Sequence, residues 1–147
     1  MNTLMRGLLG LAGGIALAVS ASAQAPIPVA HLADRSGATS DVGVPYAQGV
    51  DDTLAWINRA REGVDGWPLE VNTIDYGYQA PRAVSQYQAW MSRLKPVAIQ
   101  GWGTADTEAL ISFVTRDQVP YISGSYAAAL TDPTGKATKA AKATPFN

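Results

Sequence analysis

Cysteine is absent from this sequence of 147 residues, and histidine occurs once, as His31. Without cysteine the chain has no disulfide framework, no thiolate metal site and no thiol nucleophile, and His31 has no second imidazole with which to share a zinc ion. Charged residues are scarce at 16%, and 11 Lys and Arg nearly balance 12 Asp and Glu. Because binding to phosphates requires a dense basic face, we expect no nucleic-acid partner.

Hydrophobic residues make up 47% of the chain, which also contains 14 glycines and 9 prolines. This composition excludes a disordered tail, a collagen-like repeat and a coiled coil. It predicts a folded domain with many turns, and the length corresponds to about one domain.

The first 23 residues have the features of a cleavable signal peptide. A short positive region with Arg6 precedes an apolar run over residues 8–19, and Ala21 and Ala23 place small side chains at the −3 and −1 positions of a signal peptidase site. A membrane anchor is the alternative, but about a dozen apolar residues fall short of the roughly 20 that span the hydrocarbon core. We therefore expect a chain that starts at Gln24 after cleavage and lies in the periplasm.

From residue 27 onward the hydrophobic pattern alternates between the periods of strands and helices. Apolar residues recur at helical spacing in three segments, the first of which contains Tyr46, Val50, Leu54 and Ile57. The predicted order is a strand at 27–33, a helix after residue 43, a strand at 69–75, a helix at 80–94, a strand at 97–100, a helix around 109–114 and a strand at 119–122. Residues 130–147 are predicted to form a solvated connector.

Strands joined by helical crossovers run parallel, with helices on both faces of the sheet. The predicted fold class is therefore α/β, a doubly wound, mainly parallel open sheet in three α/β/α layers. In such sheets ligands bind where loops leave the carboxyl ends of the strands. Four loops meet this condition, at residues 34–43, 75–81, 101–104 and 123–127.

The loop at 101–104 has the clearest binding features. Gly101, Gly103 and Thr104 connect a strand to a helix, where glycine flexibility would let free N–H groups at the helix start face a carboxylate. Thr104 either caps this helix or offers its hydroxyl to the ligand. Trp102 either packs under the neighbouring loop or faces the cleft.

Three other residues need an interpretation. Tyr76 and Tyr78 follow the strand at 69–75, where they are either exposed turn residues or part of the site. His31 lies inside the first predicted strand, and the sequence offers no obvious orienting partner for it. We expect His31 to be a packed or hydrogen-bonded core residue and not a catalytic base.

Four segments in register resemble the type 1 periplasmic binding proteins, specifically the leucine/isoleucine/valine-binding branch that delivers solutes to ABC importers. The segments are Ile27-Pro28-Val29-Ala30-His31-Leu32-Ala33-Asp34 with Ser36-Gly37, Gly43 and Gly49, then Asp75 with Pro81-Arg82-Ala83, then Gln100-Gly101-Trp102-Gly103-Thr104, then Val119-Pro120-Tyr121-Ile122-Ser123. The resemblance covers residues 27–147.

The resemblance implies a two-lobed protein that closes over a branched-chain amino acid or a similar small polar solute. Family members are more than twice as long, so the chain would be an N-terminal fragment, with residues 24–147 forming part of the first lobe. The loops and the resemblance together place the ligand site at seven residues: Gly37, Tyr78, Trp102, Gly103, Thr104, Ser125 and Tyr126. The implied partners are a small-molecule ligand, such as an amino acid or a related carboxylate or amide, and an ABC permease in the membrane.

The family's pattern differs from this sequence at two of these positions. Ser125 and Tyr126 match the positions that contact the ligand's ammonium, where the family often has alanine and threonine. Tyrosine is far bulkier than threonine. This departure points to a different solute or to one that stacks on aromatic rings.

Two other functions stay open. A ligand-sensing domain for a membrane receptor would use the same fold. A secreted α/β hydrolase would use Asp34, Asp75 or Asp106, but isolated aspartates at strand ends are usually caps or loop acceptors. The sequence contains no Gly-x-Ser-x-Gly elbow, Walker lysine or His-Glu-x-x-His motif. We therefore predict binding without catalysis, and neither a metal nor a cofactor.

Overall fold

Four parallel strands form the sheet of the computed structural model, which describes residues 24–127 and residue 130. The predicted signal peptide lies outside these residues, as does the predicted connector apart from residue 130. The strands, in the spatial order β2-β1-β3-β4, are β1 (Ile27–Ala33), β2 (Leu69–Asp75), β3 (Ala98–Gln100) and β4 (Tyr121–Ile122). β1 pairs with β2 along its whole length and with all three residues of β3.

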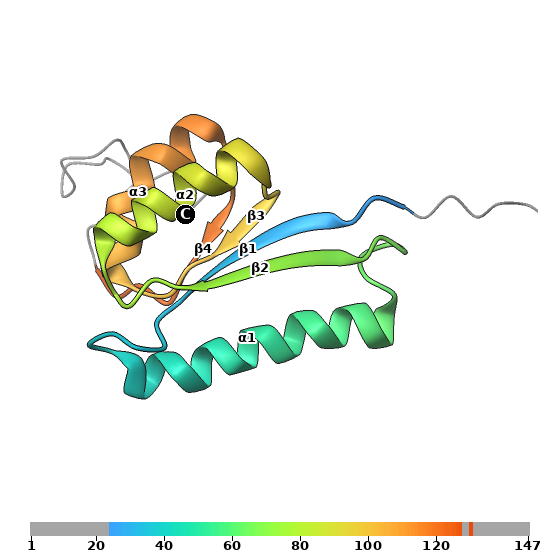
Figure 1. Ribbon diagram of the computed structural model, residues 1–147, viewed down its shortest axis with the longest axis horizontal. Coiled ribbons are helices and arrows are strands. Elements are labelled where there is room, and N and C mark those ends of the chain that lie inside the picture. The colour runs from blue at the N-terminus through green and yellow to red at the C-terminus, as the bar shows by residue number, and fades with distance from the viewer. Residues whose placement is uncertain (1–23, 128–129, 131–147) are drawn as a thin grey trace, which may run out of the picture.

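Three helices connect the strands: α1 (Ser40–Arg61), α2 (Ala80–Arg93) and α3 (Thr104–Asp117). α1 covers one face of the sheet, and α2 and α3 lie side by side on the other (Figure 1). The chain moves outward from β1 to β2 and then returns to β3 and β4, so the strand order reverses between β1 and β3. These features confirm the doubly wound parallel sheet in three layers. None of the described helices is long and apolar enough to cross a bilayer.

The main core lies between the sheet and the pair α2 and α3. Leu32, Tyr87, Ile99, Leu110 and Tyr121 are each no more than 1% exposed there. Burying a large apolar side chain contributes about 1.5–3 kcal/mol, so this layer is the main source of the fold's stability.

The first predicted loop is shorter than expected, because α1 begins at Ser40 and not after Gly43. Gly43 lies inside the helix, where a Cβ atom would come within 2.2 Å of the carbonyl oxygen of Asp34. The glycine is therefore required for close approach of α1 to the end of β1. Pro45 is the sixth residue of α1, so the carbonyl of Asp41, four residues earlier, lacks the N–H partner that a helix normally provides.

The interpretation of Tyr76 as an exposed turn residue is wrong, since its side chain is fully buried. Its N–H donates to the carbonyl of Ala33 at 2.9 Å, which continues the pairing of β1 and β2 by one residue. Strand alternation then places Tyr76 on the same face of the sheet as Ile74. Tyr78, two residues later, is half-buried and has a left-handed backbone with φ of 57°.

Candidate ligand-binding site

A cavity of about 300 Å³ lies at the carboxyl ends of the strands, between the starts of α1 and α3. Five of the seven predicted site residues line it, namely Tyr78, Trp102, Gly103, Thr104 and Tyr126. The rest of the wall is formed by Ala38, Thr39, Asp41, Val42 and Gly124. All four predicted loops therefore contribute to one cavity.

Asp106 fixes the loop that follows β3. Its carboxylate is fully buried and accepts the N–H groups of Trp102 at 3.0 Å and Gly103 at 2.9 Å, together with the hydroxyls of Tyr76 and Tyr121. Burial raises the pKa of both tyrosines, and the adjacent Asp106 carboxylate raises it further, so both hydroxyls remain protonated donors. Four hydrogen bonds to one charged group hold the loop in a single conformation.

The start of α3 leaves donors free for a ligand. Gly103 is the N-cap residue, and Thr104 is the first helical residue, so Thr104 does not cap the helix. The N–H groups of Thr104 and Ala105 have no acceptor within the helix, because the first residues of any α-helix lack one. Among the described residues the Thr104 hydroxyl makes no hydrogen bond either. These three donors are available to an oxygen atom of a bound solute.

Trp102 lines the cavity while its edge is held by the first loop. Buried Asp34 accepts hydrogen bonds from the N–H of Gly37 at 2.7 Å and from the hydroxyl of Thr39 at 2.6 Å. The Thr39 oxygen in turn accepts the indole N–H of Trp102 at 2.8 Å, and the indole packs against Tyr46 with ring centroids 4.8 Å apart. Both interpretations of Trp102 therefore hold in part, because it packs on a neighbouring loop and also forms a wall.

Gly37 and Ser125 do not line the cavity. A Cβ atom on Gly37 would lie 2.3 Å from backbone atoms of Gly77, so this glycine permits contact between two loops. The Ser125 hydroxyl donates to Thr107 on α3 at 2.9 Å and so holds the loop after β4. Tyr126 lies at the outer rim of the cavity and is 97% exposed.

Asp75 organises the loop after β2. Burial alone would raise the pKa of its carboxyl, but hydrogen bonds from Ser36 and from the N–H groups of Arg35 and Gly77 outweigh burial and lower the pKa. Asp34, Asp75 and Asp106 are thus all acceptors for loop donors, as expected of aspartates at strand ends. In the part of the chain that the structure describes, no group of three His, Asp or Glu side chains is placed to hold a metal ion.

His31 is fully buried on the face of the sheet that α1 covers, apart from the cavity. Its Nδ1 atom lies 3.2 Å from Asp51 of α1, which also pairs with Arg35. The prediction of a hydrogen-bonded core residue is confirmed, but the expected lack of an orienting partner is wrong, because only the packing of α1 brings Asp51 to His31. Burial lowers the pKa of His31 although Asp51 acts in the opposite direction.

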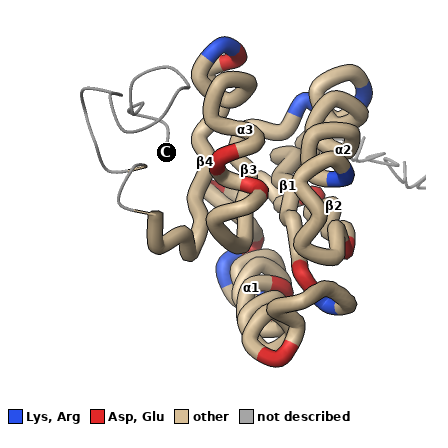
Figure 2. Tube along the Cα trace, turned by 90° about the vertical axis from the view of Figure 1, so that its left-hand side faces the viewer, with Lys and Arg blue, Asp and Glu red and all other residues tan. Residues whose placement is uncertain are grey.

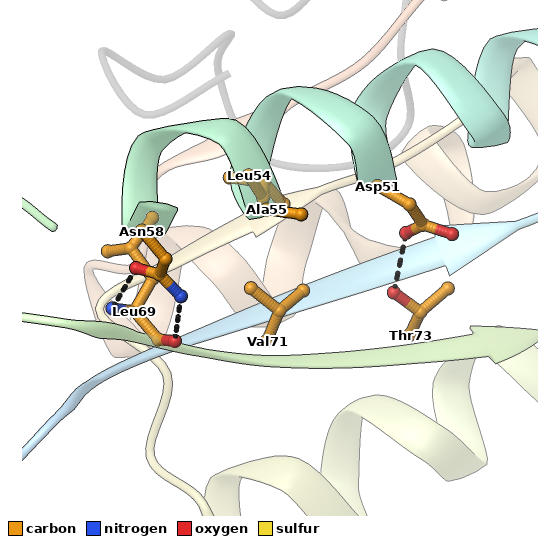
Figure 3. Close-up of a pocket in the computed structure, with 7 residues that line it drawn as sticks. All are labelled: Asp51, Leu54, Ala55, Asn58, Leu69, Val71 and Thr73. Atoms are coloured by element: carbon orange, nitrogen blue, oxygen red, sulfur yellow. Dashed lines mark hydrogen bonds between the residues drawn. The ribbon is translucent and has the colours of Figure 1, made fainter. Parts of the chain in front are cut away.

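A larger cavity of about 500 Å³ runs between α1 and β2 (Figure 3). There the Asn58 side-chain amide accepts a hydrogen bond from the N–H of Leu69 at 2.7 Å and donates one to its carbonyl at 2.8 Å. The Thr73 hydroxyl donates to Asp51 at 3.0 Å. The polar groups of this groove are thus paired with one another, and the groove follows the side of the sheet instead of its carboxyl edge. The smaller cavity, which has free donors, is the better candidate for a ligand site.

Comparison with known proteins agrees with this geometry. The sequence model of the periplasmic binding proteins matches residues 26–143. The chain belongs to the periplasmic binding protein family. No curated protein matches significantly.

Several solved structures share the fold. The branched-chain amino acid transporter substrate binding protein LivJ from Streptococcus pneumoniae, solved in complex with isoleucine, is 26% identical with a TM-score of 0.67 over 72% of this chain. An ABC transporter substrate binding protein from Aeropyrum pernix is 36% identical with a TM-score of 0.59 over 69% of this chain. A fatty acid ABC transporter substrate-binding protein from Thermomonospora curvata is 24% identical with a TM-score of 0.65 over 72% of this chain.

The resemblance to the branched-chain amino acid branch is thereby confirmed, as is the partial match to a lobe of the type 1 periplasmic binding proteins. The aligned region covers only 31%, 27% and 27% of these three solved chains. The chain therefore corresponds to a minor part of their length.

Sequence reasoning missed several contributors to the site. Thr39 and Asp41 line the cavity, but the predicted loop at 34–43 hid the helix start that places them. Asp106 was considered as a hydrolytic acid or, like Asp34 and Asp75, as a general cap or loop acceptor, and not as the residue that holds the loop after β3. An aspartate three residues after the N-cap Gly103 is, however, a recognised capping pattern, and this signal indicates its structural role.

Proposed function

We propose that the chain is the solute-binding subunit of an ABC importer, or part of that subunit, and that it acts in the periplasm. Its ligand would be an amino acid or a related small carboxylate or amide, bound in the cavity at the carboxyl ends of the strands. The observation that carries the proposal is the start of α3, where N–H groups lack a helical acceptor and Thr104 lines a cavity that aromatic residues also line. The family match and the transporter proteins among the similar structures support it.

The proposed binding mode involves no covalent step. An oxygen atom of the solute accepts hydrogen bonds from Thr104 and Ala105, while its less polar part contacts Tyr78 and Trp102. In the whole protein a second lobe closes over the solute, and the permease recognises the closed form. The buried carboxylates beside the cavity already accept loop hydrogen bonds, so they position the walls and do not act on the solute.

The proposal is tested by a thermal-shift screen of amino acids, carboxylates and amides, followed by calorimetry on the solutes that bind. Thr104→Val removes one ligand donor and should weaken binding by about 1–3 kcal/mol, or roughly 5- to 150-fold. Thr115→Val on the same helix is the matched control, because the Thr115 hydroxyl bonds the carbonyl of Ile111, outside the cavity lining. Equal affinity of Thr104→Val and the wild type would exclude Thr104 from the site.

A further inference from the structure

We propose that the solute is a net cation, whose alkylammonium or quaternary ammonium group is recognised by the aromatic side chains of the cavity and by the Asp41 carboxylate. This inference rests on the proposed function, since it concerns the same cavity. It adds the net charge of the solute.

Two half-buried aromatic side chains, Tyr78 and Trp102, line a cavity of about 300 Å³, and the exposed Tyr126 lies at its rim. Trp102 cannot swing away freely, because its indole N–H is bonded to Thr39 and its ring packs on Tyr46. Tyr78 is held against Gly103, where a Cβ atom would lie 2.9 Å from the tyrosine ring. Several aromatic rings around one small space are the usual setting for binding ammonium groups through cation–π attraction.

The charge of the cavity has the matching sign. Asp41 lines it and, among the described residues, makes neither a hydrogen bond nor an ion pair. Two more carboxylates lie behind residues of the cavity wall. Asp34 accepts a hydrogen bond from the hydroxyl of Thr39, and Asp106 accepts the N–H groups of Trp102 and Gly103. Figure 2 looks onto this edge of the sheet and shows acidic positions at the near ends of α1 and α3.

Positive charge does not offset these carboxylates. No Lys or Arg is among the described residues that line the cavity. Arg82 lies outside the lining and donates to the backbone carbonyl of Asp75 at 3.0 Å. The starts of α1 and α3 each contribute roughly half a positive charge, about +1 in total, against three carboxylates.

The small size of the cavity makes this charge effective. A sphere of about 300 Å³ is only about 8 Å across, which is less than the Debye length of about 10 Å at 0.1 M salt. Any group inside the cavity therefore experiences the exposed Asp41 carboxylate with little screening by dissolved ions. A cation gains from this field and an anion loses, while the donors at the start of α3 still serve a hydroxyl or carbonyl oxygen of the same solute.

The test compares choline with 3,3-dimethyl-1-butanol, which has the same shape and differs by a carbon in place of the charged nitrogen. Both are titrated into the ¹⁵N-labelled full chain, and amide shifts of the cavity residues give each affinity. We expect choline to bind at least tenfold more tightly. Asp41→Asn should remove most of this preference and leave the affinity for the alcohol unchanged. Asp52→Asn is the matched control, because Asp52 is an exposed acid of α1 that bonds Gln48 outside the cavity lining.

The outcomes separate the two proposals. Equal binding of choline and the alcohol at the cavity, or a choline preference that survives in Asp41→Asn, overturns the ammonium inference and leaves the proposed function standing. If isoleucine binds at the cavity and choline produces no shift, the ammonium inference is likewise overturned and the proposed function stands. If no solute of any class shifts the cavity residues, both proposals fail.

Discussion

Asp106 is the residue on which the shape of the cavity depends most, and replacing it by asparagine tests that dependence with little change of volume. The substitution converts one acceptor oxygen into an NH₂ donor. A tyrosine hydroxyl that faces the new donor can rotate and accept from it, but a backbone N–H from Trp102 or Gly103 cannot. One buried N–H then lacks an acceptor, which costs about 1–3 kcal/mol, and the remaining hydrogen bonds lose their charge assistance, at about 1 kcal/mol more.

We therefore expect Asp106→Asn to lower the free energy of unfolding by about 2–4 kcal/mol. Urea unfolding at pH 7, followed by far-UV circular dichroism, measures this quantity. Glu108→Gln on the same helix is the control, because Glu108 is exposed and the change should stay within about 0.5 kcal/mol. If Asp106→Asn unfolds at the same urea concentration as the wild type, the four hydrogen bonds do not hold the loop and the reasoning is refuted.

Three further changes test other parts of the fold. Burial lowers the pKa of His31 below 6.5, so the unfolded chain binds this proton first, and stability should fall as the pH drops from about 6.5 toward the folded-state pKa. His31→Gln should flatten urea-derived stability in that window, and an unchanged slope would assign the dependence to other groups. Asn58→Ala removes two hydrogen bonds to the backbone of Leu69 and should cost about 1–3 kcal/mol in the same assay, whereas a loss below 0.5 would make them irrelevant. Gly101→Ala would place a Cβ atom 2.1 Å from the Tyr121 hydroxyl and should cost about 1–3 kcal/mol; a wild-type midpoint would mean that the loop relaxes freely.

The hydrophobic periods were sufficient to predict the order of strands and helices. Bounds at 27–33 and 69–75 agree with β1 and β2, because alternation and turn residues mark both ends of these strands. The start of α1 was misplaced, since glycine and proline usually indicate a turn and the close contact of Gly43 with Asp34 is a tertiary effect.

The location of the candidate cavity was predictable, but its internal contacts were not. The carboxyl ends of parallel strands meet at one edge, so loop positions alone indicate where the cavity lies. Which loop residues face it depends on hydrogen bonds between distant segments, such as that from Trp102 to Thr39, 63 residues away. For the same reason, Gly37 and Ser125 lie behind the wall although their loops form it.

The central claim is that this chain binds a small solute at the carboxyl ends of its strands. Amide shifts of the ¹⁵N-labelled chain, recorded against a panel of amino acids, amides and ammonium compounds, test it most directly. We expect shifts confined to residues 38–42, 101–105 and 124–126 for the solutes that bind. Shifts centred instead on Leu54, Asn58 and Val71, in the groove between α1 and β2, would contradict the claim, and so would a panel that shifts nothing.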